Sequence, residues 1–258
     1  MKYAVVQSEI TKPEPDALAT AFRALPELVD VDAATLSSDA YGIIADEFDL
    51  EHATRLSAAL KAEGISTEVV PYADLPELTP AKHVQRLDCT AEHMLLYDTV
   101  GHTTAVPWSE VVLVAAGLVT APEFTRIEHT RTVMRGAAPR GGAYPILLAD
   151  ISSHEETRSR LALEIYMSTA PVRIGINAHE FQYNYLAERM KGRYMENYVL
   201  LVQDVGTLAG SAILNRGAES LRDDSTVTFH YPTRHAFEEE VVWLLWSRMQ
   251  AQCNEGEQ

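Results

Sequence analysis

Two prolines within five residues, Pro76 and Pro80, divide the sequence into parts with different hydrophobic patterns. Proline lacks a backbone N–H and stops regular structure, so this stretch (DLPELTP) is typical of a linker. The charge changes at the same place: residues 1–80 carry 15 acidic and 5 basic side chains, whereas residues 81–178 carry 10 and 9. We therefore predict two domains, residues 1–78 and residues 79–258.

The first part alternates between strand and helix patterns. Short apolar runs predict strands at Lys2–Gln7, Tyr41–Ala45 and Ile65–Val70. One helix starts near Pro15, and a second is capped by Asp49 and ended by Gly64. The order β-α-β-α-β suits a small sandwich, in which right-handed crossovers place both helices on one side of the sheet.

The second of these helices carries a family resemblance. Residues 49–70 resemble the helix–Gly-Ile–strand signature of bacterial ferredoxin-like sensory and signal-transducing domains, at Ala53, Leu56, Leu60, Gly64, Ile65 and Val69. The resemblance implies a ferredoxin-like α/β sandwich that acts as a binding or regulatory module. It brings no catalytic residue with it.

The second part reads as successive strands followed by helices. We predict strands at 83–89, 94–97, 103–108, 111–119, 160–167 and 172–177, and a helix from Tyr194. In the strand 160–167 (RLALEIYM) large apolar residues alternate with Ala162, Glu164 and Tyr166, which is the period of a half-buried strand. Residues 120–158 show little regular pattern and are rich in glycine and proline, so we expect a long loop there.

Antiparallel strands closed by a helix also resemble a known fold class. The Pro107-Trp108 dipeptide before the long apolar strand, together with the closing helix, looks like bacterial pleckstrin-homology-like domains. The predicted fold class is therefore α+β: a ferredoxin-like domain followed by an antiparallel, pleckstrin-homology-like domain with C-terminal helices. Such folds host many functions.

The C-terminal stretch Thr233–Gln252 predicts a strong helix. Thr233 can cap it, and three glutamates lie near its positive N-terminal end. The run Val241–Trp246 is apolar at six consecutive positions, which covers every side of a helix. Two hypotheses stay open for Trp243 and Trp246: burial in the core, and a self-association surface between two copies.

Four arginines fall within the expected loop: Arg126, Arg131, Arg135 and Arg140. Arginine forks bind carboxylates or phosphates through two hydrogen bonds. We interpret these residues as a docking site for an acidic partner or for the acidic N-terminal domain of a second copy. The alternative is a solvated loop with scattered ion pairs.

Metal and nucleophile candidates are weaker. His83, Cys89, His93 and His102 offer imidazole and thiolate ligands that zinc favours, but their spacing matches no known zinc motif. Ordinary surface histidines are the favoured interpretation, so no metal and no cofactor are assigned. Asp150, Ser152, Ser153 and His154 match a hydrolase triad in composition only, and a polar loop is favoured. Walker, GxGxxG, GxSxG and HExxH motifs are absent.

The net charge of −16 argues against nucleic acid and anionic membranes as partners, because both repel an acidic chain. The N-terminus lacks the apolar run of a signal peptide, and the two cysteines have no CxxC partner, so we expect a cytoplasmic protein. The first hypothesis is a non-enzymatic regulatory, scaffolding or ligand-sensing protein. The alternatives are a metal-dependent enzyme using the His83–His102 region and a structural self-assembling protein.

Overall fold

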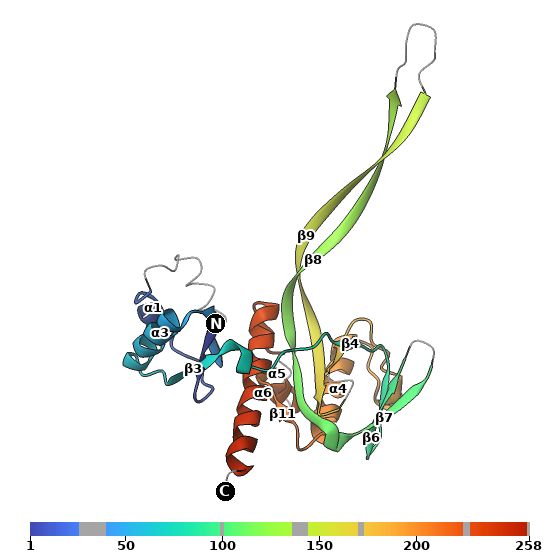
Figure 1. Ribbon diagram of the computed structural model, residues 1–258. Helices are drawn as coiled ribbons and strands as arrows, with labels where there is room; N and C mark the ends of the chain where they lie inside the picture. Colours follow the sequence, from blue (N-terminus) through green and yellow to red (C-terminus); the bar gives the residue numbers. More distant parts are fainter. Residues whose placement is uncertain (26–39, 99–100, 136–143, 170–172, 224–227, 257–258) are drawn as a thin grey trace. The chain divides into compact units, whose positions relative to one another are not determined.

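The computed structural model describes residues 1–25, 40–98, 101–135, 144–169, 173–223 and 228–256, and for 122–135 and 144–156 it describes the backbone (Figure 1). These residues form two compact units. The main unit comprises Met1–Val119 and Arg160–Gln258, and the hairpin unit comprises Thr120–Ser159. The class is α+β, as expected from the sequence. The predicted domain boundary after residue 78 stays a prediction.

The N-terminal elements follow the predicted order: β1 (Tyr3–Gln7), α1 (Pro15–Phe22), β2 (Ile43–Phe48), α3 (Leu50–Ala62) and β3 (Thr67–Pro71). The sheet order is β2-β1-β3, and β1 is antiparallel to both neighbours. Helix α3 therefore joins two parallel strands by crossing over β1. Its cap is the predicted one, since Asp49 Oδ1 accepts a hydrogen bond from the His52 backbone N–H at 2.9 Å. The turn Tyr72–Asp74 follows β3.

The two faces of this sheet have different neighbours. On one face both helices share a core with the strands, so the expected placement of both helices on one side is confirmed. On the other face Ala4, Val6 and Ile43 pack against Trp243 and Trp246 of the last helix. The N-terminal sheet is thus buried on both sides.

The rest of the main unit contains two further sheets. The first is antiparallel and consists of β5 (Leu87–Cys89), β6 (His93–Tyr97) and β7 (Thr103–Pro107), followed by the turn Trp108–Glu110. The second has the order β11-β8-β9-β10-β4, with β12 also pairing with β8. Its members are β4 (Lys82–His83), β8 (Val111–Arg135), β9 (Tyr144–Met167), β10 (Arg173–Asn177), β11 (Ile213–Leu214) and β12 (His230–Tyr231).

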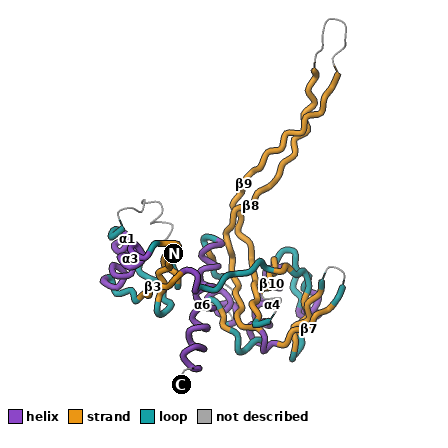
Figure 2. The backbone as a smooth tube through the Cα atoms, viewed as in Figure 1, coloured by secondary structure: helices purple, strands orange, loops and turns teal. Residues whose placement is uncertain are grey.

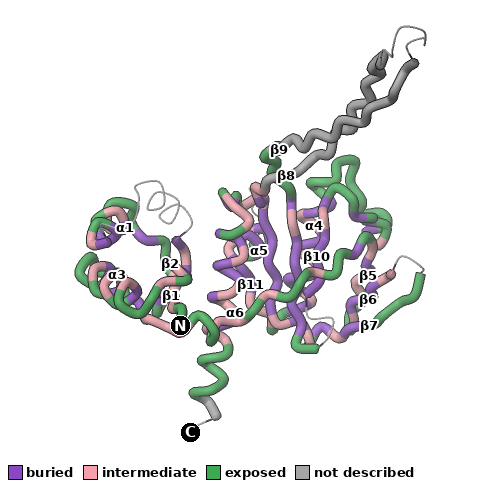
Figure 3. The backbone as a smooth tube through the Cα atoms, turned by 45° about the horizontal axis from the view of Figure 1, so that its top comes forward, coloured by how far each residue is buried: buried purple, intermediate pink, exposed green. Residues whose placement is uncertain are grey.

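Helices cover both faces of the second sheet. Helix α4 (Tyr194–Leu208), which begins where the sequence predicts, and α5 (Arg216–Arg222) share one core with β8, β9 and β10. On the opposite face α6 (Arg234–Gly256) packs through Phe237 and Val241. Buried positions accordingly lie along the main-unit parts of β8 and β9 and along β10 (Figure 3). A short 3-10 segment, Asn184–Arg189, precedes α4.

The expected loop is wrong for residues 120–135 and 144–158, which are strand. Strands β8 and β9 continue through Arg135 and from Tyr144, and they lie side by side (Figure 2). The hydroxyl groups of Thr120 and Ser159 are hydrogen-bonded across the two strands at 2.7 Å. The glycine- and proline-rich stretch that suggested a loop falls on residues 136–143, outside the described part of the chain.

Candidate functional site

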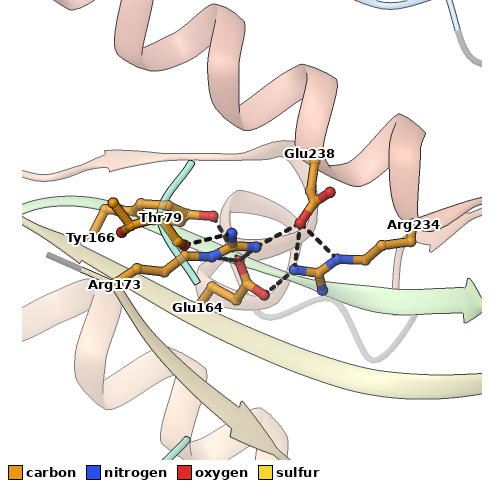
Figure 4. Close-up of polar contacts among 6 residues, drawn as sticks. All are labelled: Thr79, Glu164, Tyr166, Arg173, Arg234 and Glu238. Atoms are coloured by element: carbon orange, nitrogen blue, oxygen red, sulfur yellow. Dashed lines mark hydrogen bonds and ion pairs between the residues drawn. The ribbon is translucent and has the colours of Figure 1, made fainter. Parts of the chain in front are cut away.

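A buried cluster of charged side chains lies where β9, β10 and α6 meet (Figure 4). Glu164 and Tyr166 occupy alternate positions of β9 and therefore share a face. The antiparallel register places Arg173 of β10 directly opposite Tyr166. The Arg173 Nε donates to Glu164 Oε2 at 3.0 Å, and the Tyr166 hydroxyl donates to the same oxygen at 2.6 Å. One carboxylate oxygen thus links both strands.

Helix α6 completes the cluster. Arg234 and Glu238 are one helical turn apart, and the Arg234 Nε donates to Glu238 Oε1 at 3.1 Å. Arg234 also binds the second oxygen of Glu164. The remaining nitrogens of Arg173 donate to Glu238 at 2.7 Å and to the Thr79 carbonyl oxygen at 3.1 Å. The cluster therefore joins β9, β10, α6 and the segment before β4.

Burial and pairing shift the pKa values within this cluster. Burial and the charge of Glu164 raise the pKa of Tyr166 far above its usual value, so the phenol is neutral. Burial lowers the pKa of Arg173, but Glu164 and Tyr166 raise it, with a net increase. Burial raises the pKa of Glu238, but the hydrogen bond from Arg173 and the charge of Arg234 outweigh it and lower the pKa. Two carboxylates thus face two guanidinium groups.

This arrangement is suited to holding segments together. Glu164 is 3% exposed and Arg173 is 6% exposed, and both oxygens of Glu164 already accept hydrogen bonds. A buried charge that keeps all its partners is tolerated, whereas removal of one partner typically costs about 3–5 kcal/mol. We therefore interpret the cluster as a structural feature that holds the main-unit part of β9 to β10 and α6.

A cleft of about 570 Å³ lies beside the cluster, and its acidic lining comes from Asp46, Glu77, Glu238 and Glu239. His235 also lines it, with its Nε2 3.2 Å from a carboxylate oxygen of Glu239. Burial raises the pKa of Asp46 more than the nearby His235 lowers it. This lining disfavours an anionic ligand.

A second buried network fixes β8. The side-chain oxygen of Asn215 accepts hydrogen bonds from the backbone N–H groups of Ala116 and Ala218, both at 2.9 Å. Its nitrogen donates to the Ala116 carbonyl oxygen at 3.2 Å and to the Tyr231 hydroxyl at 2.8 Å. The Tyr231 hydroxyl in turn donates to Glu240 at 2.8 Å. Asn215 thus caps α5 and at the same time occupies the edge of β8 between its partner strands β11 and β12.

A tyrosine of α4 bridges β8 and β9. The Tyr198 hydroxyl accepts from the Gly117 backbone N–H at 3.1 Å and donates to the Ala162 carbonyl oxygen at 2.7 Å. Tyr198 lies on α4 and is fully buried. The main-unit parts of both long strands are therefore held by side chains from α4, α5 and α6.

The predicted metal ligands do not come together. Within the described ranges, no group of three or more His, Cys, Asp or Glu side chains is placed to hold a metal ion. His83 is exposed on β4, and the His102 Nδ1 lies 3.1 Å from Asp98. Burial and the charges of Asp204 and Asp88 raise the pKa of Cys89 to about 12, which disfavours the thiolate that zinc requires. The metal-dependent enzyme stays an untested alternative.

Three of the four arginines that the sequence predicts to bind a partner lie on a strand of the hairpin unit. Arg126, Arg131 and Arg135 lie on β8 within the hairpin unit, where the backbone is described. Arg140 lies outside the described residues, as do the side chains of the other three. Asp150, Ser152, Ser153 and His154 lie on β9 rather than in a polar loop. Partner binding by the arginines stays a prediction.

The two tryptophans of α6 are buried within the chain. Trp243 and Trp246 are each 6% exposed, and the Trp243 indole N–H donates to the Gln7 carbonyl oxygen at 2.8 Å. A Cβ added to Gly42 would lie 2.7 Å from Trp243, so this ring packs directly on the backbone before β2. Core burial is thus confirmed, while self-association through these residues stays a prediction.

Sequence reasoning missed both buried networks. Glu164 was assigned to the polar face of a half-buried strand, but α6 covers that face and buries Glu164 and Tyr166. The available signal was Glu164, the single charged residue between Leu161 and Met167. Its partners are 9 and 70 residues away, and no local pattern connects them.

Comparisons with family models, with curated proteins and with solved structures find no match for this chain. Among the described residues, no helix combines the length and the apolar character needed to cross a membrane.

Proposed function

We propose that the protein is a non-enzymatic scaffolding protein whose binding element is the hairpin unit. One observation carries the proposal: Thr120–Ser159 forms a compact unit of its own, to which the continuations of β8 and β9 contribute two strands. An isolated two-stranded hairpin is at best marginally stable in water and gains stability from further strands or a packed layer. A protein partner can supply either.

The main unit supports this interpretation. Side chains from three helices hold the main-unit parts of β8 and β9: Tyr198, Asn215 and Arg234. Binding elements are commonly presented on a rigid scaffold, and these contacts make the main-unit parts of β8 and β9 rigid. The partner class is an acidic protein, because Arg126, Arg131 and Arg135 lie on the hairpin strand and arginine pairs well with carboxylates.

The finer fold assignments belong to the same proposal. The β2-α3-β3 crossover over β1 supports a ferredoxin-like origin for the N-terminal domain. The series of strands from β5 to β10, followed by α4, supports a pleckstrin-homology-like second domain. Both fold classes include binding and regulatory modules, which agrees with a scaffolding role.

The proposal is tested by removing the hairpin. In the variant, an Asn-Gly turn replaces residues 120–159 and joins Val119 to Arg160. Full-length protein and variant are compared by quantitative affinity capture from the native lysate. We expect acidic proteins that are retained by the full-length chain and lost with the hairpin.

Charge reversal provides a matched control. Changing Arg126, Arg131, Arg135 and Arg140 to Glu should abolish retention, whereas the same change at four exposed main-unit residues should preserve it: Lys12, Lys61, Lys82 and Arg193. Equal retention without the hairpin contradicts the proposal. So does turnover on a broad hydrolase and transferase panel that is lost when one polar residue is changed.

A further inference from the structure

The hairpin unit has two outer strand edges without a third strand in the described chain. Apart from β9, the partners of β8 end with β12 at Val119. Apart from β8, the partner of β9 ends with β10 at Ala162. Backbone N–H and C=O groups point outward from every edge strand, and an uncovered edge is a template for another strand. Residues 120–135 and 144–159 therefore present two such templates.

The sequence protects these two edges unequally. Residues 122–135 of β8 contain Pro122 and five charged residues, and both features oppose pairing with another strand. Residues 144–154 of β9 also contain a proline, Pro145 near the start of the strand, but only one charged residue, Asp150, and the apolar run Ile146-Leu147-Leu148. With one charged residue against five, the β9 edge is the less protected of the two.

The charge distribution indicates which strand it accepts. The hairpin unit carries five acidic and five basic residues and is neutral, whereas the whole chain carries −16. Two main units therefore repel each other, but two hairpins meet no net repulsion. Antiparallel pairing of one edge with the same edge of another chain closes under two-fold symmetry, the commonest symmetry of protein dimers.

We propose that residues 144–154 of β9 pair antiparallel with the same segment of a second copy, so that two hairpins form one four-stranded sheet. This inference rests on the proposed function, since it names one partner of the same binding element. It leaves the β8 edge, with Arg126, Arg131 and Arg135, available for the acidic partner.

The test measures the mass of the purified full-length protein by sedimentation over a wide concentration range. We expect a dimer for the wild type and a dissociation constant raised at least about tenfold by Ala149→Lys, because residue 149 lies opposite itself in the second copy and the substitution places two like charges face to face. The matched variant Val133→Lys makes the same kind of change on β8 and should leave the dimer intact. All three tryptophans lie in the main unit, so unchanged emission shows that this unit still folds.

A second measurement covers the case in which Ala149→Lys unfolds the hairpin. In a Cys89→Ser/Cys253→Ser background, Ala149→Cys, at the centre of residues 144–154 and therefore opposite itself in the second copy, should form disulfide-linked dimers in air, whereas Thr130→Cys on β8 should not. A monomeric wild type at every concentration overturns the inference, as does equal dissociation by Val133→Lys. If the wild type is monomeric but capture of acidic proteins still needs the hairpin, the self-pairing is wrong and the scaffolding function stands.

Discussion

Replacement of Asn215 by Ala tests how β8 is held. The side chain is 1% exposed and makes four hydrogen bonds: with the backbone N–H and C=O of Ala116, with the Ala218 N–H and with the Tyr231 hydroxyl. A buried hydrogen bond contributes about 1 kcal/mol net, and loss of an Asn cap alone costs about 0.5–2 kcal/mol. Since water can re-enter part of the space, we expect the free energy of unfolding to fall by about 3 kcal/mol.

Urea unfolding followed by tryptophan emission measures this change, because Trp108, Trp243 and Trp246 are all buried in the main unit. A loss of about 3 kcal/mol corresponds to a decrease in Tm of roughly 6–12 °C for a chain of this size. The control is Asn177→Ala. The Asn177 side chain is half-buried and accepts one hydrogen bond, from the His179 backbone N–H at 3.2 Å. This substitution should therefore lower the free energy of unfolding by less than about 0.5 kcal/mol.

The variant Asn215→Asp separates the cap from the bridge to β8. Aspartate caps helices as well as asparagine does, so α5 keeps its cap. Its second oxygen, however, cannot donate to the Ala116 carbonyl oxygen and would lie about 3.2 Å from it. We expect Asn215→Asp to be clearly destabilising. Wild-type stability for this variant would refute the bridging role and leave Asn215 as a helix cap only.

Three further predictions follow from single contacts. The folded-state pKa of Glu238 lies below its unfolded value, so its pairing stabilises the protein above about pH 4.5 and is lost as the pH falls further. The difference in free energy of unfolding between wild type and Glu238→Gln, measured by urea titration, should therefore shrink in acid. A Cβ on Gly217 would lie 1.9 Å from the Ala116 carbonyl oxygen, so Gly217→Ala should lower the Tm strongly, whereas Gly206→Ala, with contacts at 3.7 Å or more, should not. Native protein should react with a thiol reagent at exposed Cys253. Burial raises the pKa of Cys89 to about 12, so Cys89 should react only after unfolding, and two reactive thiols in the native state would contradict this.

Local signals allowed the helices to be predicted well. Asp49 and Gly64 mark the ends of α3, and Thr233 caps α6 by accepting from the Ala236 N–H at 2.9 Å. Caps act within one helical turn, so the residues that make them are adjacent in the sequence. The alternation in β9 was likewise sufficient to predict a strand at residues 160–167.

The hairpin and the buried networks left no such signal. A period-two apolar pattern arises where one face of a strand packs on a core, and residues 120–158 lack it. The networks depend on partners far apart in the chain, such as Asn215 and Ala116 or Arg234 and Glu164. Tertiary pairing decides both, so a sequence analysis that proceeds by local pattern could not place them.

The apolar run of α6 predicted part of the packing of this helix. Six consecutive apolar residues required contacts on more than one side of the helix, and the structure supplies two sheets. Phe237 and Val241 pack on β8 and its neighbours, while Trp243 and Trp246 pack on β1 and β2. The sequence thus indicated that α6 is covered on more than one side, but it did not indicate which sheets cover the helix. Since both indoles are already buried within the chain, the uncovered edge of β9 is the better surface on which to seek a second copy.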